Sequence, residues 1–105
     1  MKLQYSPKAK EDLHNIKQYI SDELQNKKAA LHITQSILCS CSLLKSQPFL
    51  GLQLSQLINR ETSIRYLISG KYIIFYIVEN EYISVLRFLD SRTYYMQKIF
   101  ELLDD

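Results

Sequence analysis

The sequence predicts a single α+β domain in which a helical hairpin packs on a twisted antiparallel sheet. Two stretches near the N-terminus repeat apolar residues at helical spacing. Three later stretches are rich in Ile, Tyr, Val and Phe and are separated by gaps of turn length. The chain has 105 residues, which suits one core. Because helices and strands are segregated along the chain, we expect the α+β class and treat residues 1–105 as one domain.

Residues 2–5 predict a short strand that ends where a helix begins. Ser6 can cap that helix, and Pro7 suits its first position because the N–H that proline lacks would be unsatisfied there anyway. Residues 7–24 then show helical periodicity, which predicts an amphipathic first helix. Its apolar positions are Leu13, Ile16, Ile20 and Leu24.

A second helix is predicted over residues 27–45, with Asn26 as its cap. The connection between the two helices is short, so they should form an antiparallel hairpin. Pro48 and Gly51 end this region. The apolar stripe of the second helix consists of Ala30, Ile33, Ile37, Cys41 and Leu44.

Residues 49–62 have a weak pattern and predict a loop with a short strand or a turn of helix. Residues 63–69, 72–79 and 82–89 predict an antiparallel meander. Its middle run, YIIFYIV, is apolar on both faces and should be the central strand. Residues 91–103 predict a closing helix with Tyr95, Ile99 and Leu102 or Leu103 on one side. We expect the sheet face opposite the hairpin to be left to solvent or a partner.

The formal net charge is +2, too small to indicate nucleic-acid binding by itself. All four arginines lie in the second half of the chain, where their planar guanidinium groups suit phosphate or carboxylate. Pairing with neighbouring acidic residues is the alternative, and the sequence leaves both open. These arginines are Arg60, Arg65, Arg87 and Arg92.

The two cysteines, Cys39 and Cys41, have a C-x-C spacing that points helical side chains to different faces. We expect buried or half-buried free thiols in a reducing cytosol, no metal and no cofactor. The N-terminus is charged throughout, and no apolar run approaches the roughly 20 residues of a membrane span. These features favour a cytoplasmic protein without a membrane partner.

Several motifs occur in a set order. The opening YSPKAKEDLHNIKQYI (residues 5–20) matches the pattern Y-S-P-x-A-x-x-D-L-x-x-I-x-x-Y-I. It is followed by KAA at residues 28–30, PFLG at 48–51, RYL at 65–67, YIIFY at 72–76 and VLRFLDSR at 85–92. In this order and spacing they resemble toxins of the RelE/ParE superfamily of bacterial type II toxin–antitoxin systems, whose later motifs are P-x-x-G, R-x-L, Y-x-I-x-Y and I-x-R-I-x-H-x-R-R.

The resemblance implies the α+β fold described above and a cognate antitoxin whose C-terminal segment wraps the toxin and silences it. A hetero-oligomer with that antitoxin, growth inhibition by the free toxin and a role in plasmid stabilisation are implied in the same way. The superfamily then divides. RelE-like members cut messenger RNA on the ribosome, and ParE-like members poison DNA gyrase.

RNA cleavage needs cations that stabilise the scissile phosphate and groups that transfer protons. If the chain is a nuclease, its catalytic residues should be Arg65, Arg87, Arg92 and Tyr95, with Tyr94 close by. Three positions depart from the RelE-like pattern. Ile73 stands where those nucleases have an arginine, Asp90 where many relatives have a histidine, and Thr93 where the second arginine of the ending would be. A carboxylate beside the phosphate would repel it.

Our hypothesis is therefore a ParE-like toxin that acts by binding, with DNA gyrase as its target. The alternatives are a ribosome-dependent mRNA endoribonuclease and an inactive relative that only binds antitoxin. His14 and His32 are expected to be solvated helix residues. The antitoxin should present an acidic, amphipathic segment that docks as a helix or an added strand. Residues expected to bind the target or the antitoxin are Arg60, Arg65, Tyr72, Arg87, Arg92, Tyr94 and Tyr95.

Overall fold

The computed structural model describes residues 1–93 and 95–103, and it contains every strand and helix that the sequence predicts. The weakly patterned region holds both a short strand and a helical turn. The elements in chain order are β1 (Lys2–Tyr5), α1 (Pro7–Gln18), η1 (Tyr19–Glu23), α2 (Lys27–Leu43), β2 (Leu52–Gln53), α3 (Leu54–Ile58), β3 (Arg65–Ser69), β4 (Tyr72–Val78), β5 (Tyr82–Asp90) and α4 (Tyr95–Leu103).

The five strands form one sheet in the order β1-β5-β4-β3-β2. The central position of β4 confirms the prediction from its two-sided apolar pattern, and β3, β4 and β5 form the expected antiparallel meander. β1 pairs with β5 in parallel, from Lys2 beside Tyr82 to Tyr5 beside Val85. The complete sheet is therefore mixed, because the first strand joins the last one at the edge of the meander.

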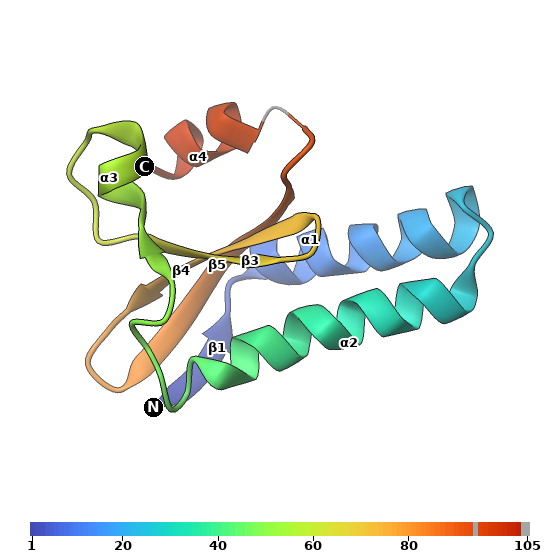
Figure 1. The fold of residues 1–105 in the computed structure, drawn as a ribbon, viewed down its shortest axis with the longest axis horizontal. Helices are drawn as coiled ribbons and strands as arrows, with labels where there is room; N and C mark the ends of the chain where they lie inside the picture. The colour runs from blue at the N-terminus through green and yellow to red at the C-terminus, as the bar shows by residue number, and fades with distance from the viewer. Residues whose placement is uncertain (94, 104–105) are drawn as a thin grey trace.

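The helices α1 and α2 lie side by side as an antiparallel hairpin on one face of the sheet (Figure 1). Both predicted caps are present. The Ser6 hydroxyl accepts a hydrogen bond from the Ala9 amide at 3.0 Å, and the Asn26 side chain accepts one from the Ala29 amide at 2.9 Å. The buried core under the hairpin consists of Ala9, Ile37, Cys41, Leu44, Tyr72, Ile74, Tyr76, Ile83, Val85 and Phe88.

The end of the first helix differs from the prediction. The regular α-helix stops at Gln18 and continues as the π-helical turn η1, in which the Leu24 amide donates to the carbonyl of Tyr19, five residues back. A wider turn changes the angular step between side chains. Leu24, which the periodicity placed in the apolar stripe, is 58% exposed.

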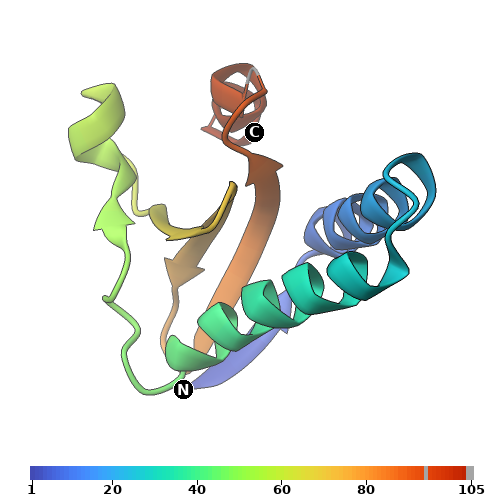
Figure 2. The same ribbon diagram turned by 45° about the vertical axis from the view of Figure 1, so that its right-hand side comes forward.

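Part of the sheet face opposite the hairpin is covered, whereas we expected that face to be left to solvent or a partner; Leu52 and Ile68 on the same face remain exposed. In Figure 2 the hairpin lies on one side of the strands, with α3 and α4 away from it. Ile99 of α4 and Leu54 of α3 are fully buried there, because each short helix turns an apolar side to the sheet. The second core on this face consists of Leu54, Ile64, Ile73, Phe75, Leu89 and Ile99.

Two side chains from the first helical segment complete the outer edge of β5. β1 pairs with β5 only as far as Val85, which leaves the outer side of β5 beyond Val85 without a neighbouring strand, while β4 pairs with its inner side. The Ser6 hydroxyl donates to the Leu86 carbonyl at 2.8 Å. The Asp12 carboxylate accepts from the Phe88 amide at 3.1 Å. These bonds satisfy backbone groups that a strand would otherwise pair, and they attach α1 to the sheet.

The same carboxylate holds Arg87, which is only 5% exposed. The guanidinium donates two hydrogen bonds to Asp12, at 2.6 and 2.9 Å. These bonds are the main reason that the pKa of Arg87 is raised, while its burial acts in the opposite direction. A buried guanidinium of this kind depends on its partner, because an unpaired charge in the interior is costly.

We predict that Asp12→Asn lowers the free energy of unfolding by about 3 kcal/mol, because it leaves the buried guanidinium without a counter-ion. Chemical denaturation followed by circular dichroism measures this. Asp90→Asn is the matched control, since Asp90 pairs with the exposed Arg92, and it should change stability far less. Equal effects of the two substitutions would show that the Asp12–Arg87 pair has no special role.

The two cysteines differ in environment. Cys41 is fully buried, and burial raises the pKa of its thiol to about 11. Cys39 is exposed, so the expectation of buried or half-buried thiols holds only for Cys41. Residues two positions apart on an α-helix point to different sides, which explains why Cys41 is buried and Cys39 is not.

We predict that a thiol reagent such as DTNB modifies Cys39 rapidly at about pH 8 and leaves Cys41 unmodified until the protein unfolds. The thiolate is the reactive form, and the raised pKa keeps the Cys41 thiol protonated at this pH. Spectrophotometric titration should count one thiol per native chain and two in denaturant. A Cys39→Ser variant that still reacts quickly in its native state would contradict this.

Candidate functional site

A groove runs between the tip of the helical hairpin and one end of the sheet. It consists of two adjoining cavities of about 480 and 720 Å³ that share Tyr19, Tyr72 and Arg92. The smaller cavity continues along the hairpin tip, and the larger cavity continues along α1 toward α4. We call it the hairpin groove. Its other apolar members are Ile16, Ile20, Leu24, Ile33, Ile37, Phe88 and Leu89, and its basic members are His32, Lys71, Arg92 and Lys98.

The turn between β3 and β4 fixes one wall of the hairpin groove. Gly70 has a φ of 59°, a left-handed conformation that suits a two-residue hairpin turn. The turn brings Lys71 to the groove and starts β4 at Tyr72, opposite Asp90 of β5. The Tyr72 side chain is nearly buried, and burial raises the pKa of its hydroxyl. Asp90 raises that pKa further, and Arg92 lowers it.

Asp90, which stands at the family's histidine position, organises the chain before α4. Its carboxylate accepts two hydrogen bonds from the Arg92 guanidinium, at 3.0 and 2.8 Å, and one from the Arg92 amide. These bonds hold the pKa of Asp90 below its usual range. The Thr93 hydroxyl donates to the Asp90 carbonyl at 2.8 Å. The two departures from the family ending thus act together to stabilise this turn.

Arg65 is bound to the P-x-x-G junction at the other end of β3. Its guanidinium donates to the Gly51 carbonyl at 2.8 Å and lies 4.8 Å from the centre of the Phe49 ring. The Tyr76 hydroxyl accepts from the Gly51 amide at 2.8 Å and donates to the Pro48 carbonyl at 2.9 Å. A Cβ on residue 51 would lie 2.6 Å from that hydroxyl. The motif residues therefore hold the junction against the sheet.

The structure brings together only two of the expected site residues that it describes, Tyr72 and Arg92. Arg65 lies beside Tyr76, four residues further along β4, which is roughly 13 Å away at the rise of a strand. Arg87 is buried against α1.

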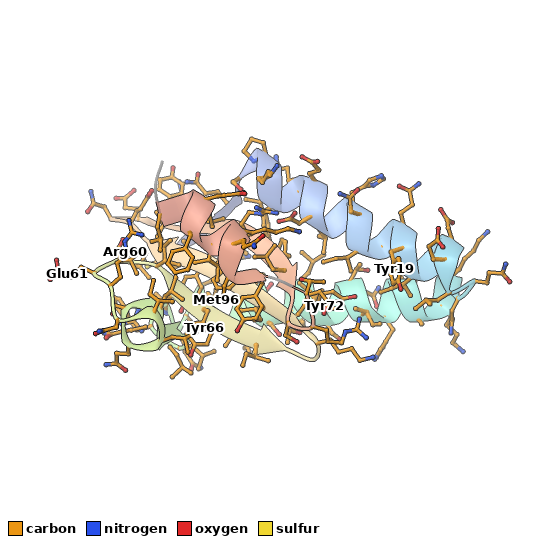
Figure 3. The ribbon with its side chains drawn as sticks, turned by 90° about the horizontal axis from the view of Figure 1, so that it is seen from above. Tyr19, Arg60, Glu61, Tyr66, Tyr72 and Met96 are labelled. Carbon is orange, nitrogen blue, oxygen red and sulfur yellow. The ribbon has the colours of Figure 1, made fainter. Side chains whose placement is uncertain are left out.

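The remaining expected residues lie elsewhere. Tyr95 contacts the second core, on the opposite face of the sheet from Tyr72. Figure 3 shows Arg60 and Glu61 at the end of the molecule away from Tyr19 and Tyr72. Tyr94 lies outside the described residues. The arginines thus belong to separate parts of the fold and do not converge on one point.

Groove residues that sequence reasoning missed include Tyr19, Leu24 and Lys71. Tyr19 belongs to the Y-I pair that ends the opening motif, and Leu24 was assigned to the core. Exposed apolar side chains cannot be told from core residues by periodicity when a helix changes its pitch. His14 and His32 are exposed, as expected.

Within residues 1–93 and 95–103, no group of three or more His, Cys, Asp or Glu side chains is placed to hold a metal ion. Over the same residues, no helix is long and apolar enough to cross a membrane.

Comparisons with known proteins concern the family and the fold of the chain. The family model described as ParE toxin of type II toxin–antitoxin system, parDE, matches residues 3–95. A solved chain of the chromosomal ParDE toxin–antitoxin system from P. aeruginosa has a similar fold, with a TM-score of 0.70 and 22% sequence identity, over 86% of this chain and 95% of that chain. The search of curated proteins found no match. Because the family model spans most of its length, this chain belongs to the ParE family of toxins of type II toxin–antitoxin systems.

Proposed function

We propose that this toxin inhibits growth by binding DNA gyrase and that an antitoxin silences it by docking in the hairpin groove. The proposal of gyrase binding rests on one observation, namely that three of the arginines already bind groups within the fold. Arg65 binds the P-x-x-G junction, Arg87 is buried against Asp12, and Arg92 pairs with Asp90. A toxin that acts by binding needs a surface rather than a converging set of cations.

The same contacts argue against ribosome-dependent cleavage of mRNA. The transition state of phosphodiester cleavage is stabilised by preorganised cations that converge on the scissile phosphate. Here the strand position that carries an arginine in RelE-like nucleases is the buried Ile73. The one guanidinium in the hairpin groove, that of Arg92, already has a carboxylate partner. An incoming phosphate would have to compete with Asp90 for it, close to a negative charge.

The hairpin groove suits the acidic, amphipathic segment expected of an antitoxin. Apolar side chains make up much of its walls, and its cations Lys71, Arg92 and Lys98 outnumber its carboxylates Asp12 and Asp90. An amphipathic helix laid in an apolar groove buries one face and leaves its charged face to the rim. This supports a complex of toxin and antitoxin, and it retains Tyr72 and Arg92 as antitoxin-binding residues. A cytoplasmic location and a role in plasmid stabilisation remain part of the proposal on the resemblance alone.

We predict that the purified chain inhibits supercoiling by purified gyrase and does not cleave mRNA on programmed ribosomes. Agarose gels of relaxed plasmid and primer extension on translated mRNA measure the two activities. A chain unfolded by heat serves as the control in both assays.

Cleavage of mRNA without inhibition of supercoiling would establish the mRNA endoribonuclease. Loss of cleavage in Arg65→Ala or Arg92→Ala would strengthen that conclusion. A third result would identify an inactive relative that only binds antitoxin. In that case, expression without antitoxin would leave colony formation unchanged, and neither assay would respond.

We predict that Leu24→Glu weakens binding of the antitoxin, encoded by the open reading frame beside this one, by at least about tenfold. The substitution removes apolar contact area and adds a charge that repels an acidic segment. Leu31→Glu is the matched control, because Leu31 is similarly exposed on α2 and lies outside the cavities that form the groove. Isothermal titration calorimetry would measure the affinity of each variant for the antitoxin. Equal affinities of the two variants would show that the groove is not part of the antitoxin interface.

A further inference from the structure

A second apolar surface lies at the edge of the sheet formed by β2, with α3 beside it. Five large apolar side chains there are between 42% and 64% exposed. Several exposed apolar side chains at one edge of a sheet mark an interaction site in a soluble protein. We call this surface the edge patch, and it consists of Phe49, Leu50, Leu52, Leu57 and Ile68.

The sheet geometry explains why these side chains are not covered. Leu52 pairs with Tyr66 across β2 and β3, so both point to the same face, and Ile68 follows two residues along β3. β2 has only two residues, and Ile68 lies beyond the part of β3 that β2 covers. Leu54, by contrast, is fully buried, which anchors the segment so that the patch is held in a fixed shape.

The edge patch also has an unusual charge distribution. Across residues 46–70 the only charged residues are Arg60, Glu61 and Arg65. Depletion of charge together with aromatic and arginine residues is typical of the centre of protein interfaces. The Arg65 guanidinium lies over one face of the Phe49 ring, so a positive charge lies at the Phe49 end of the patch, on the hairpin side of the sheet edge. A partner should therefore offer apolar side chains and a carboxylate.

The edge patch and the hairpin groove are separate surfaces with different shapes. They share no residue, and Figure 3 shows Tyr66, beside the patch, at a distance from Tyr19 and Tyr72 of the groove. The groove is hollow and suits a single helix. The patch is an outer edge that lines neither cavity of the groove, and it suits the surface of a folded protein.

We propose that the edge patch contacts the toxin's target, through an apolar and acidic surface of that protein, while the hairpin groove serves the antitoxin. The proposal rests on the function proposed above, in which the target is gyrase. It assigns Leu52 and Ile68 as the central contact residues, and Arg65 beside Phe49 as the cation on the hairpin side of the edge. Binding of a folded target at this edge needs no rearrangement of the arginines that hold the fold together.

The test compares the intact chain with two double variants in a supercoiling assay with purified gyrase. Leu52→Glu with Ile68→Glu places two carboxylates in the patch, where both positions are exposed enough to accept them. Leu31→Glu with Leu38→Glu adds the same charge on the exposed side of α2. Circular dichroism checks that all three proteins are folded. We expect the patch variant to need at least about tenfold more protein for half-inhibition, and the α2 variant to match the wild type.

Three outcomes would overturn the proposal. Equal inhibition by the folded patch variant and the wild type would remove the patch from the target interface and leave gyrase inhibition intact. No inhibition by the wild type would refute the gyrase function and this assignment together. If the wild type is a dimer by light scattering and the patch variant is a monomer, a second copy of the chain occupies the patch instead.

Discussion

The fold depends on one carboxylate that lies between the helical hairpin and the sheet. Asp12 accepts hydrogen bonds from the Arg87 guanidinium and from the Phe88 amide, at the place where β1 no longer covers β5. It therefore takes the place of a missing strand and supplies the counter-ion for a buried cation. Ser6 satisfies the neighbouring carbonyl and caps α1. Two residues of the opening motif thus attach the first helix to the last strand, and they also fix the height of the hairpin above the sheet.

A second set of contacts fixes the opposite edge in the same way. The Tyr76 hydroxyl and the Arg65 guanidinium bind backbone groups of the segment from Pro48 to Gly51, and the close approach requires glycine. The arginines that the resemblance suggested for phosphate chemistry are consequently occupied by the fold. Their positive charge still contributes at surfaces, as Arg65 does beside Phe49. This use of cations favours recognition over catalysis.

The two proposed surfaces follow from these attachments. The hairpin is longer than the sheet edge it covers, so its π-helical tip overhangs the turn at Gly70 and leaves a hollow lined by Tyr19 and Tyr72. At the other edge, β2 is too short to cover β3, and apolar side chains remain outside. Because both features arise from differences in length between neighbouring elements, they are properties of the whole fold and not of any single motif.

The sequence by itself determined the elements, their order, the caps at Ser6 and Asn26 and the central place of β4, because these depend on local spacing and on apolar patterning. It also determined the family. Only the tertiary structure decided that β1 joins the sheet in parallel, that α4 covers part of the second face and that Arg87 is buried. Each of these depends on contacts between residues far apart in the chain, which periodicity does not report. The candidate site was predictable only for Tyr72 and Arg92, since whether an arginine meets a partner protein or an internal carboxylate is set by where the fold places Asp12 and Asp90.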